Sequence, residues 1–175
     1  MKRRDFIKAV GIGAVGLILD GKIFAAAKGE NAMKIQAVKF YENGFMTQPF
    51  ACGLEDGIEK FDANVKYRSC LQNFVIDTGK EIILVDTGVP EDFPAQVVDE
   101  KTQIFVGVKI KNYMDALKDL GYQPEQVSKI LITQKHPDHT GALKHFPNAK
   151  IYASREECKA EELNFKNVVP VDFTD

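Results

Sequence analysis

Residues 134–141 of this 175-residue chain read Gln-Lys-His-Pro-Asp-His-Thr-Gly. They follow residues 129–133, whose sequence Lys-Ile-Leu-Ile-Thr predicts a buried strand. His136, Asp138 and His139 therefore lie just beyond the carboxyl end of a strand, where open α/β sheets place their ligand sites. Imidazole and carboxylate groups together suit zinc or another divalent metal. This density of ligands favours a metal site over a polar loop that only caps the next helix.

The elements on either side of this stretch predict an α/β layered domain. The predicted strands are residues 35–40, two stretches within 65–77, 81–85, 129–133 and 150–153, and the predicted helices are 109–120, a short one after Gly141 and one that begins at Ser154. Residues 77–80 have the composition of a hairpin turn, and residues 89–107 are expected to form a long surface loop. Gly121 ends the first helix, and Ser154 with Glu157 predicts a capping box. Antiparallel strands followed by strand–helix alternation indicate the layered arrangement.

The composition excludes a wholly disordered chain, a collagen-like repeat and a coiled coil. Apolar residues make up 45% of the chain and charged residues 27%, which is ordinary for a globular protein. The net charge of −2, with no basic cluster beyond the N-terminus, gives no reason to expect nucleic acid as a partner. No apolar run reaches the roughly 18 residues that a membrane-spanning helix needs.

The N-terminus has the three parts of an export signal, which we expect to occupy residues 1–27. Arg3 and Arg4 are followed by an apolar run over residues 9–19 and by three alanines at 25–27. The paired arginines resemble the twin-arginine pattern, which implies export by the bacterial twin-arginine machinery to the periplasm or the medium. A plain secretory signal or an uncleaved anchor are the alternatives. With cleavage, residues 28–175 would remain, without a stable membrane anchor.

Four further side chains lie outside the predicted metal site. His145 follows His139 by six residues, a spacing that turns it away on a helix, so we expect it on the surface. Cys52, Cys70 and Cys158 contain no CxxC pair. In an oxidising compartment Cys52 and Cys70 are the favoured pair for a disulfide. The equal alternative is three half-buried free thiols.

The chain resembles a known family over about residues 33–162. Residues 134–139 are similar to the His-x-His-x-Asp-His signature of metallo-β-lactamase-fold hydrolases, with glutamine at the first position. Residues 75–88 resemble the early hairpin of that family, and residues 141–149 its exit helix and next strand. The resemblance is greatest to lactonase-like members. It implies a layered αβ/βα sandwich, of which this chain would form the N-terminal half to two-thirds.

The resemblance also implies a chemistry for named residues. Gln134 and His136 would face one metal ion, and Asp138 and His139 a second. Asp138 would be the catalytic residue, orienting the attacking water and receiving a proton, while Asp86 would support the metal-binding loop from behind. The cofactor would be one or two zinc ions, or another divalent metal. The reaction would be metal-assisted hydrolysis of a small lactone or similar cyclic ester or amide.

Two departures from the family pattern support a second hypothesis. Gln134 is a weaker zinc ligand than imidazole, and His145 is the only histidine after His139. We therefore expect either the N-terminal portion of a longer metallohydrolase or a degenerate, non-catalytic domain with weak metal or partner binding. A third hypothesis is an aspartic protease, because Asp77 and Asp86 each begin an Asp-Thr-Gly sequence. Their positions on successive hairpin strands count against a shared-proton dyad.

Overall fold

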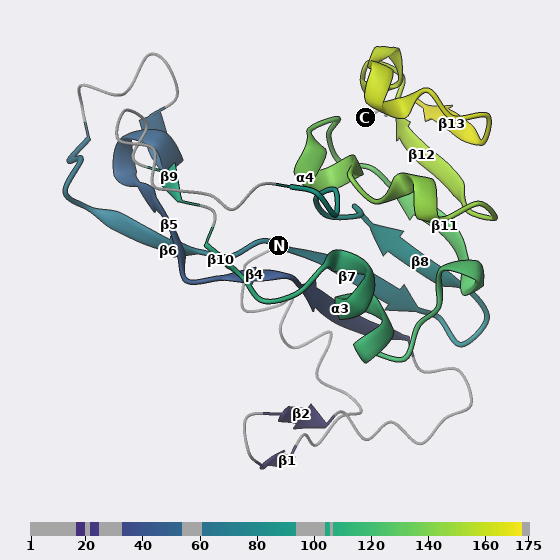
Figure 1. Cartoon of the computed structure of the whole chain (residues 1–175), viewed down its shortest axis with the longest axis horizontal. Coiled ribbons are helices and arrows are strands. Elements are labelled where there is room, and N and C mark those ends of the chain that lie inside the picture. Colours follow the sequence, from purple (N-terminus) through teal and green to yellow (C-terminus); the bar gives the residue numbers. More distant parts are fainter. Residues whose placement is uncertain are drawn as a thin grey trace, which may run out of the picture.

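The main body of the protein is a six-stranded mixed sheet in the order β13-β12-β11-β8-β7-β3 (Figure 1). The computed structural model describes residues 17–19, 22–24, 33–53, 61–93, 104–105 and 107–172. The strands of this sheet are β3 (Lys34–Lys39), β7 (Gln72–Asp77), β8 (Ile82–Val85), β11 (Val127–Leu131), β12 (Lys150–Ser154) and β13 (Val168–Val171). Strands β3, β7 and β8 pair antiparallel, whereas β8, β11, β12 and β13 pair parallel. This mixed sheet confirms the predicted α/β class.

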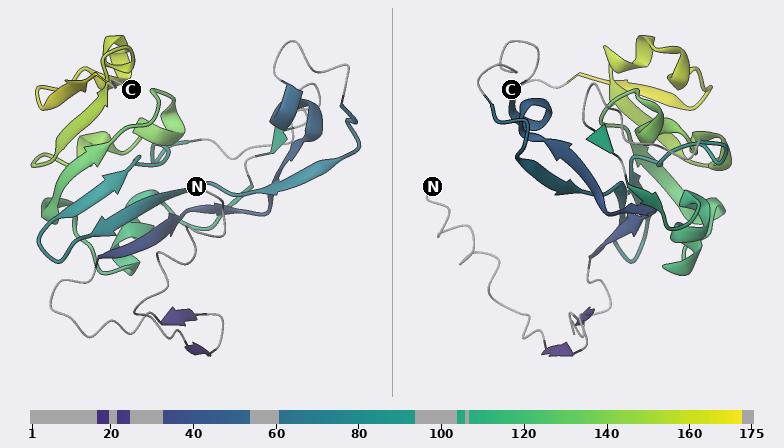
Figure 2. Two further views of the ribbon diagram at one scale, coloured as in Figure 1. Left: turned by 180° about the vertical axis from the view of Figure 1, so that it is seen from behind. Right: turned by 60° about the vertical axis from the view of Figure 1, so that its left-hand side comes forward.

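Three smaller sheets accompany the body. Strands β5 (Gly44–Thr47), β6 (Lys66–Ser69) and β9 (Ile104–Phe105) form a three-stranded sheet, and with the π-helical turn η1 (Pro49–Gly53) they make an arm that projects from the body (Figure 2). Strand β4 (Tyr41–Glu42) pairs with β10 (Val108–Lys109) at the base of the arm. Strand β1 (Leu17–Leu19) pairs with β2 (Lys22–Phe24) inside the predicted export signal. The other residues of that signal lie outside the described ranges.

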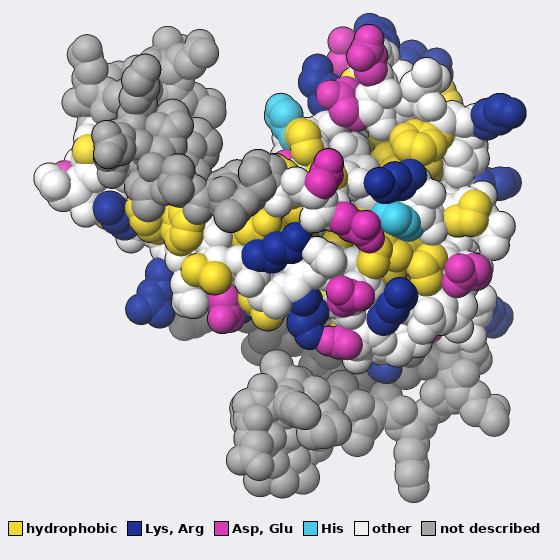
Figure 3. Space-filling view, in the orientation of Figure 1, with side chains coloured by type: hydrophobic (Ala, Val, Ile, Leu, Met, Phe, Trp, Pro, Cys, Tyr) yellow, Lys and Arg dark blue, Asp and Glu magenta, His cyan; other side chains and the backbone are white. Residues whose placement is uncertain are grey.

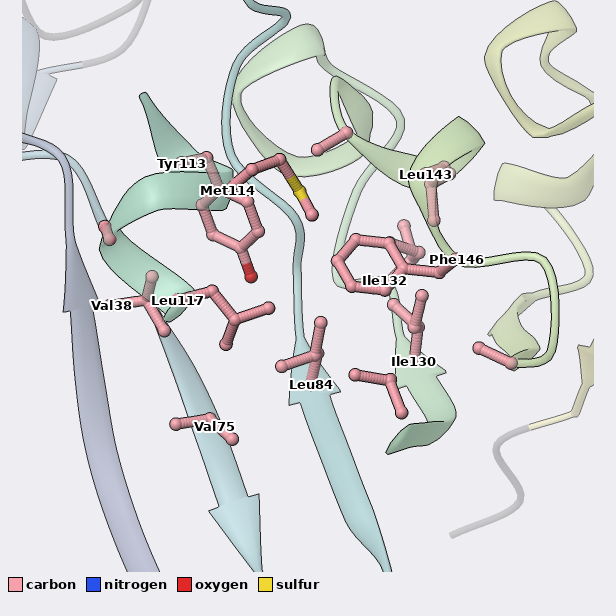
Figure 4. Packing of buried hydrophobic residues seen from close by; sticks show 14 of the residues in the cluster. Val38, Val75, Leu84, Tyr113, Met114, Leu117, Ile130, Ile132, Leu143 and Phe146 are labelled. Carbon is pink, nitrogen blue, oxygen red and sulfur yellow. The ribbon is translucent and has the colours of Figure 1, made fainter. Parts of the chain in front are cut away.

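One face of the body sheet carries the core. Val38, Val75, Leu84 and Ile130 point to this face and are at most 1% exposed. Helix α3 (Tyr113–Asp119) packs against them and buries Leu117 completely, as Figure 4 shows. The remaining helical segments are α4 (Pro137–Thr140) and the 3-10 turns η3 (Pro124–Gln126), η4 (Leu143–His145), η5 (Glu157–Lys159) and η6 (Glu161–Leu163). The apolar residues at every second strand position thus meet the apolar stripe of α3.

The opposite face of the body sheet is apolar as well, but no described helix covers it (Figure 2). Phe74, Leu131 and Val169 are 40%, 39% and 36% exposed. The strand registers place them in one row, because Phe74 and Leu131 both pair with Val85, and Leu131 and Val169 both pair with Tyr152. This row crosses the sheet from β7 to β13.

The structure corrects three predicted boundaries. The helix predicted over residues 109–120 begins at Tyr113, because β10 pairs with β4 and Ile110 donates its N–H to the carbonyl of Phe40. The predicted loop 89–107 contains β9, a strand that pairing with β5 creates. The strand predicted over 129–133 is β11, which begins two residues earlier. In each case the pairing partner, and not the local pattern, sets the boundary.

The structure also places His145 and the three cysteines, which lie outside the predicted metal site. His145 is not a free surface residue, since its side chain is 30% exposed and its Nε2 lies 3.8 Å from Glu91 Oε1. Cys52, Cys70 and Cys158 are free thiols, so the disulfide alternative is not realised. None of the helices in the described ranges has the length and apolar character needed to cross a membrane.

Candidate metal centre

The site begins where the chain leaves β8. Asp86 and Gly88 both adopt left-handed backbone conformations, with φ values of 61° and 68°. The N–H of Asp86 donates to the carbonyl of Leu131 at 2.9 Å, which ties this turn to the end of β11. A left-handed conformation costs a non-glycine residue about 1 kcal/mol. The surrounding contacts therefore hold Asp86 in an orientation that a free chain would avoid.

Tyr113 of α3 holds the same turn from the core. Its hydroxyl donates to the carbonyl of Asp86 at 3.2 Å. Its ring lies so close to Gly88 that a Cβ there would be 2.5 Å from it, so only glycine fits. Burial, followed by the negative charge of Asp86, raises the pKa of Tyr113. The hydroxyl therefore stays neutral and remains a hydrogen-bond donor.

The carboxylate of Asp86 connects the ends of β8 and β11. Its Oδ1 accepts the N–H of Thr133 at 2.9 Å, and its Oδ2 accepts the Thr133 hydroxyl at 2.8 Å. The same Oδ2 lies 2.8 Å from Nδ1 of His139. An ionised carboxylate only accepts hydrogen bonds, so the proton of His139 is assigned to Nδ1. The lone pair of His139 is then on Nε2, which faces away from Asp86.

Two of the predicted metal ligands, Gln134 and Asp138, lie beside Nε2 of His139, and His136 is linked to them through Gln134. Nε2 of Gln134 lies 2.6 Å from Nε2 of His139, and Oδ2 of Asp138 lies 3.3 Å from the same atom. Oε1 of Gln134 lies 2.8 Å from Nδ1 of His136. The side chains of His139 and Asp138 are 19% and 38% exposed, so the cluster is open to solvent on one side. The predicted residues thus form a chain of contacts, His136–Gln134–His139–Asp138, with Asp86 behind His139.

Backbone contacts fix the short helix α4 that carries Asp138 and His139. The carbonyl of His139 accepts the N–H of Thr87 at 2.7 Å and its hydroxyl at 3.1 Å. The N–H of Gly141 donates to the carbonyl of Gly88 at 2.8 Å. A Cβ at Gly141 would lie 2.3 Å from the nitrogen of Pro90. The turn after β8 and the helix after β11 are therefore in direct backbone contact.

The chemistry of this cluster fits a divalent metal. Across the described ranges no three His, Cys, Asp or Glu side chains are grouped so that they could hold a metal ion by themselves. The amide of Gln134 lies between His136 and His139, and its oxygen adds a neutral donor to the set. Imidazole nitrogen, carboxylate oxygen and amide oxygen are all donors that divalent metals accept. The set is therefore one of mixed donors rather than a cage of histidines.

Three residues of the site were missed by the sequence analysis. Thr133 bonds the carboxylate of Asp86, and Thr87 bonds the carbonyl of His139. Tyr113 bonds the carbonyl of Asp86 in the turn after β8. Thr87 follows Asp86 within the second Asp-Thr-Gly sequence, which is the one signal that pointed to it. Nothing in the local pattern distinguishes Tyr113 from any other core residue of a helix.

The geometry excludes the aspartic protease hypothesis. Asp77 pairs with Ile82 at the turn end of β8, whereas Asp86 follows the other end of that strand. The four residue steps from Ile82 to Asp86 place the backbone positions of the two aspartates roughly 13 Å apart along the strand. Asp77 is also held elsewhere, because its Oδ2 accepts the hydroxyl of Tyr122 at 3.2 Å. The two carboxylates cannot share a proton.

The site lies at the edge of the body sheet where the parallel strands β8 and β11 end. In the space-filling view a histidine and acidic side chains lie on the margin of the body that faces the arm (Figure 3). Helix α4 lies on this edge of the body (Figure 1). The carboxyl end of a parallel pair is the position that the sequence predicted for the ligand site.

Two curated proteins are similar to parts of this chain. N-acyl homoserine lactonase AttM of Rhizobium johnstonii is 41% identical over 49 residues, which are 28% of this chain and 19% of that protein. N-acyl homoserine lactonase AiiB of Agrobacterium fabrum is 24% identical over 91 residues, 48% of this chain and 32% of that protein. The matched part of the chain thus spans at most about a third of the curated relatives.

Solved structures share the fold. The structure of a B. thuringiensis AiiA mutant with N-decanoyl-L-homoserine bound at its active site matches with a TM-score of 0.57 and 20% identity, over 81% of this chain and 61% of that chain. A probable metal-dependent hydrolase from Staphylococcus aureus matches with a TM-score of 0.55 and 14% identity, over 81% and 60% of the two chains. Residues 72–167, more than half of this chain, match the family model of the metallo-beta-lactamase superfamily. The match spans the turn after β8, the loop that carries residues 134–139, and β12, and the chain therefore belongs to the metallo-beta-lactamase superfamily.

Proposed function

We propose that the protein is an exported, metal-dependent hydrolase that opens a lactone or a similar cyclic ester or amide, with zinc as its metal. The observation that carries the proposal is the orientation of His139, whose Nδ1 is held by Asp86 and whose Nε2 lies 3.3 Å from Asp138. N-acyl homoserine lactones are the first substrates to test, because two relatives are named as lactonases of this class.

The residues of the site divide the work of such a reaction. A divalent metal bound here would polarise the substrate carbonyl and make a water molecule more acidic. Asp86 holds Nδ1 of His139, so that the Nε2 lone pair, on the side of Gln134 and Asp138, would be available to the metal. The carboxylate of Asp138, which is 38% exposed, is accessible to substrate. It takes the proton of the attacking water and returns it to the alcohol oxygen that leaves as the ring opens. Gln134 and His136 complete the donor set.

The proposal is tested by lactone hydrolysis with the full chain, with and without a chelator. We expect activity that is abolished by chelation and restored by zinc. Asp138→Asn should lower kcat/KM by about 100-fold or more, which is the usual effect of losing a general acid–base. Asp115→Asn, an exposed acid on α3, is the matched control and should retain full activity. Equal activity of the Asp138 variant and the control would refute the role of Asp138.

The second candidate is a non-catalytic domain that binds metal weakly. The observation in its favour is the Gln134 amide between the two histidines, where the family motif has an imidazole. Under this alternative the chain binds zinc but hydrolyses no lactone in the same assay. Gln134→His separates the two candidates further, since only a true hydrolase gains activity together with metal affinity.

The proposed export rests on the sequence of residues 1–27. Fusion of these residues to a folded reporter should carry the reporter to the periplasm in a bacterial host. Replacement of Arg3 and Arg4 together by lysine should retain it in the cytoplasm, because the paired arginines are the recognised feature. Export of the double variant at the original level would contradict the twin-arginine assignment.

A further inference from the structure

Two peptide groups join Gln134 to His136, and a side chain from the segment after β12 holds the first of them, between Gln134 and Lys135. The N–H of Lys135 donates to Oε2 of Glu157 at 2.6 Å, across 22 residues of sequence. The carbonyl of Lys135 accepts the hydroxyl of Thr140 at 3.2 Å. The backbone N–H and the backbone carbonyl of Lys135 are therefore both hydrogen-bonded. Each of these bonds orients the peptide group on its own side of the residue.

The fold explains why Glu157 reaches this position. Strands β11 and β12 are parallel with Leu131 opposite Tyr152, so the segments that follow them leave the sheet at the same edge. Turn η5 follows β12, and the N–H of Glu157 donates to the Ser154 hydroxyl at 3.1 Å. The predicted capping box is thus half correct. The Glu157 carboxylate bonds Lys135 instead of returning to the N–H of Ser154.

The contact is poorly suited to a purely stabilising role. Lys135 is exposed, so water could satisfy its N–H if the carboxylate were removed. The loss would therefore change the free energy of unfolding little. It would, however, free the Gln134–Lys135 peptide plane, which carries Gln134 directly and His136 one residue further on. Orientation of ligands is what groups behind a metal site supply.

We propose that Glu157 is a positioning residue of the metal centre, acting through the Lys135 peptide to hold Gln134 and His136 in place for the metal. This inference rests on the proposed metal-dependent function. It assigns to Glu157 a role in metal affinity and ligand geometry, with no contact to substrate or metal. Glu157 also adds a negative charge beside the loop, at hydrogen-bond distance from the Lys135 N–H, which favours a bound cation.

The test is a Co²⁺ titration of the metal-free full chain, followed by visible absorption, for three variants. Glu157→Ala removes the acceptor and should weaken Co²⁺ binding by about 10- to 100-fold and alter the ligand-field spectrum. Glu157→Gln keeps an oxygen acceptor for Lys135 and should recover most of the affinity and the wild-type spectrum. Glu156→Ala is the matched control, because Glu156 is 79% exposed and its carboxylate bonds Lys159, at 2.7 Å, and not the Lys135 N–H. It should bind as the wild type does.

The outcomes separate this inference from the proposed function. A wild-type chain that binds no Co²⁺ would refute the metal centre and the role of Glu157 with it. A wild-type chain that binds Co²⁺, with Glu157→Ala binding equally well, would refute Glu157 alone. Amide hydrogen exchange of the metal-free chain gives a readout without any metal. The Lys135 amide should exchange at least several-fold faster in Glu157→Ala than in the Glu156→Ala control, and unchanged exchange would contradict the hydrogen bond.

Discussion

Replacement of Asp86 by asparagine changes the hydrogen-bonding pattern of the site while preserving its shape. In the wild type, the carboxylate accepts three bonds of 2.8 to 2.9 Å from Thr133 and His139. Asparagine tolerates the left-handed conformation of this position, where φ is 61°. Its amide can still accept the N–H of Thr133, but its NH₂ group then faces Nδ1 of His139. His139 must turn Nδ1 into an acceptor, which moves the proton to Nε2.

The magnitude follows from that proton. A protonated Nε2 cannot bind a metal. In the Asp86→Asn variant, metal binding therefore requires His139 to change to the less stable tautomer, which weakens binding. Loss of such an orienting partner lowers metal affinity by about 10- to 100-fold, or roughly 1.4 to 2.7 kcal/mol. The free energy of unfolding should fall by only about 1 kcal/mol, since a charge-assisted bond becomes a neutral one. Asp86→Ala is different, because it leaves three donors unpaired and strains the backbone, for a total of about 4 kcal/mol.

The assay pairs a Co²⁺ titration with urea unfolding of the metal-free chain. We expect Asp86→Asn to lose metal affinity without losing the fold, and Asp86→Ala to lose both. If Asp86→Asn bound Co²⁺ within about twofold of the wild type, the tautomer of His139 would not depend on Asp86, and the argument from the 2.8 Å contact would be wrong.

Two further predictions concern stability. Gly141→Ala places a Cβ 2.3 Å from the backbone nitrogen of Pro90 and should lower the free energy of unfolding by about 2 to 3 kcal/mol in urea. An unchanged midpoint would show that the Gly141 contact relaxes freely. Burial, followed by the charge of Asp77, raises the pKa of Tyr122 to about 12. The unfolded chain therefore releases this proton near pH 10 while the native chain keeps it, so stability falls between about pH 10 and 12. Tyr122→Phe should flatten that fall in alkaline unfolding, and an equally steep fall would place its cause elsewhere.

The parts of the fold that could be predicted are those with short-range signals. The alternation of polar and apolar residues in β3 and β7 follows from burial of a single face, and the hairpin between β7 and β8 from its turn residues. The strands β9 and β10 have two residues each and no periodicity of their own. They exist because β5 and β4 supply partners, and that information is distant in the sequence.

The candidate site shows the same division. Gln134, His136, Asp138 and His139 are close in sequence, so their proximity in space could be predicted from spacing alone. Asp86 was assigned through the family resemblance, and the structure places it 2.8 Å from His139. Glu157 could not be assigned correctly, because its local pattern favours a capping box and only the parallel pairing of β11 with β12 brings Lys135 within reach.

The closeness of the ligands along the chain has a thermodynamic consequence. A segment that carries two histidines and an aspartate within four residues retains some affinity for divalent metals when the chain is unfolded. A ligand stabilises the native state only by the difference between its affinities for the folded and unfolded chains. Here that difference arises from Asp86, which is 53 residues away from His139, and from the backbone contacts of Thr87. For the proposed zinc site, the rise in melting temperature on adding zinc should therefore be smaller than the affinity of the native chain alone would give, and its size would measure how well the fold organises the loop.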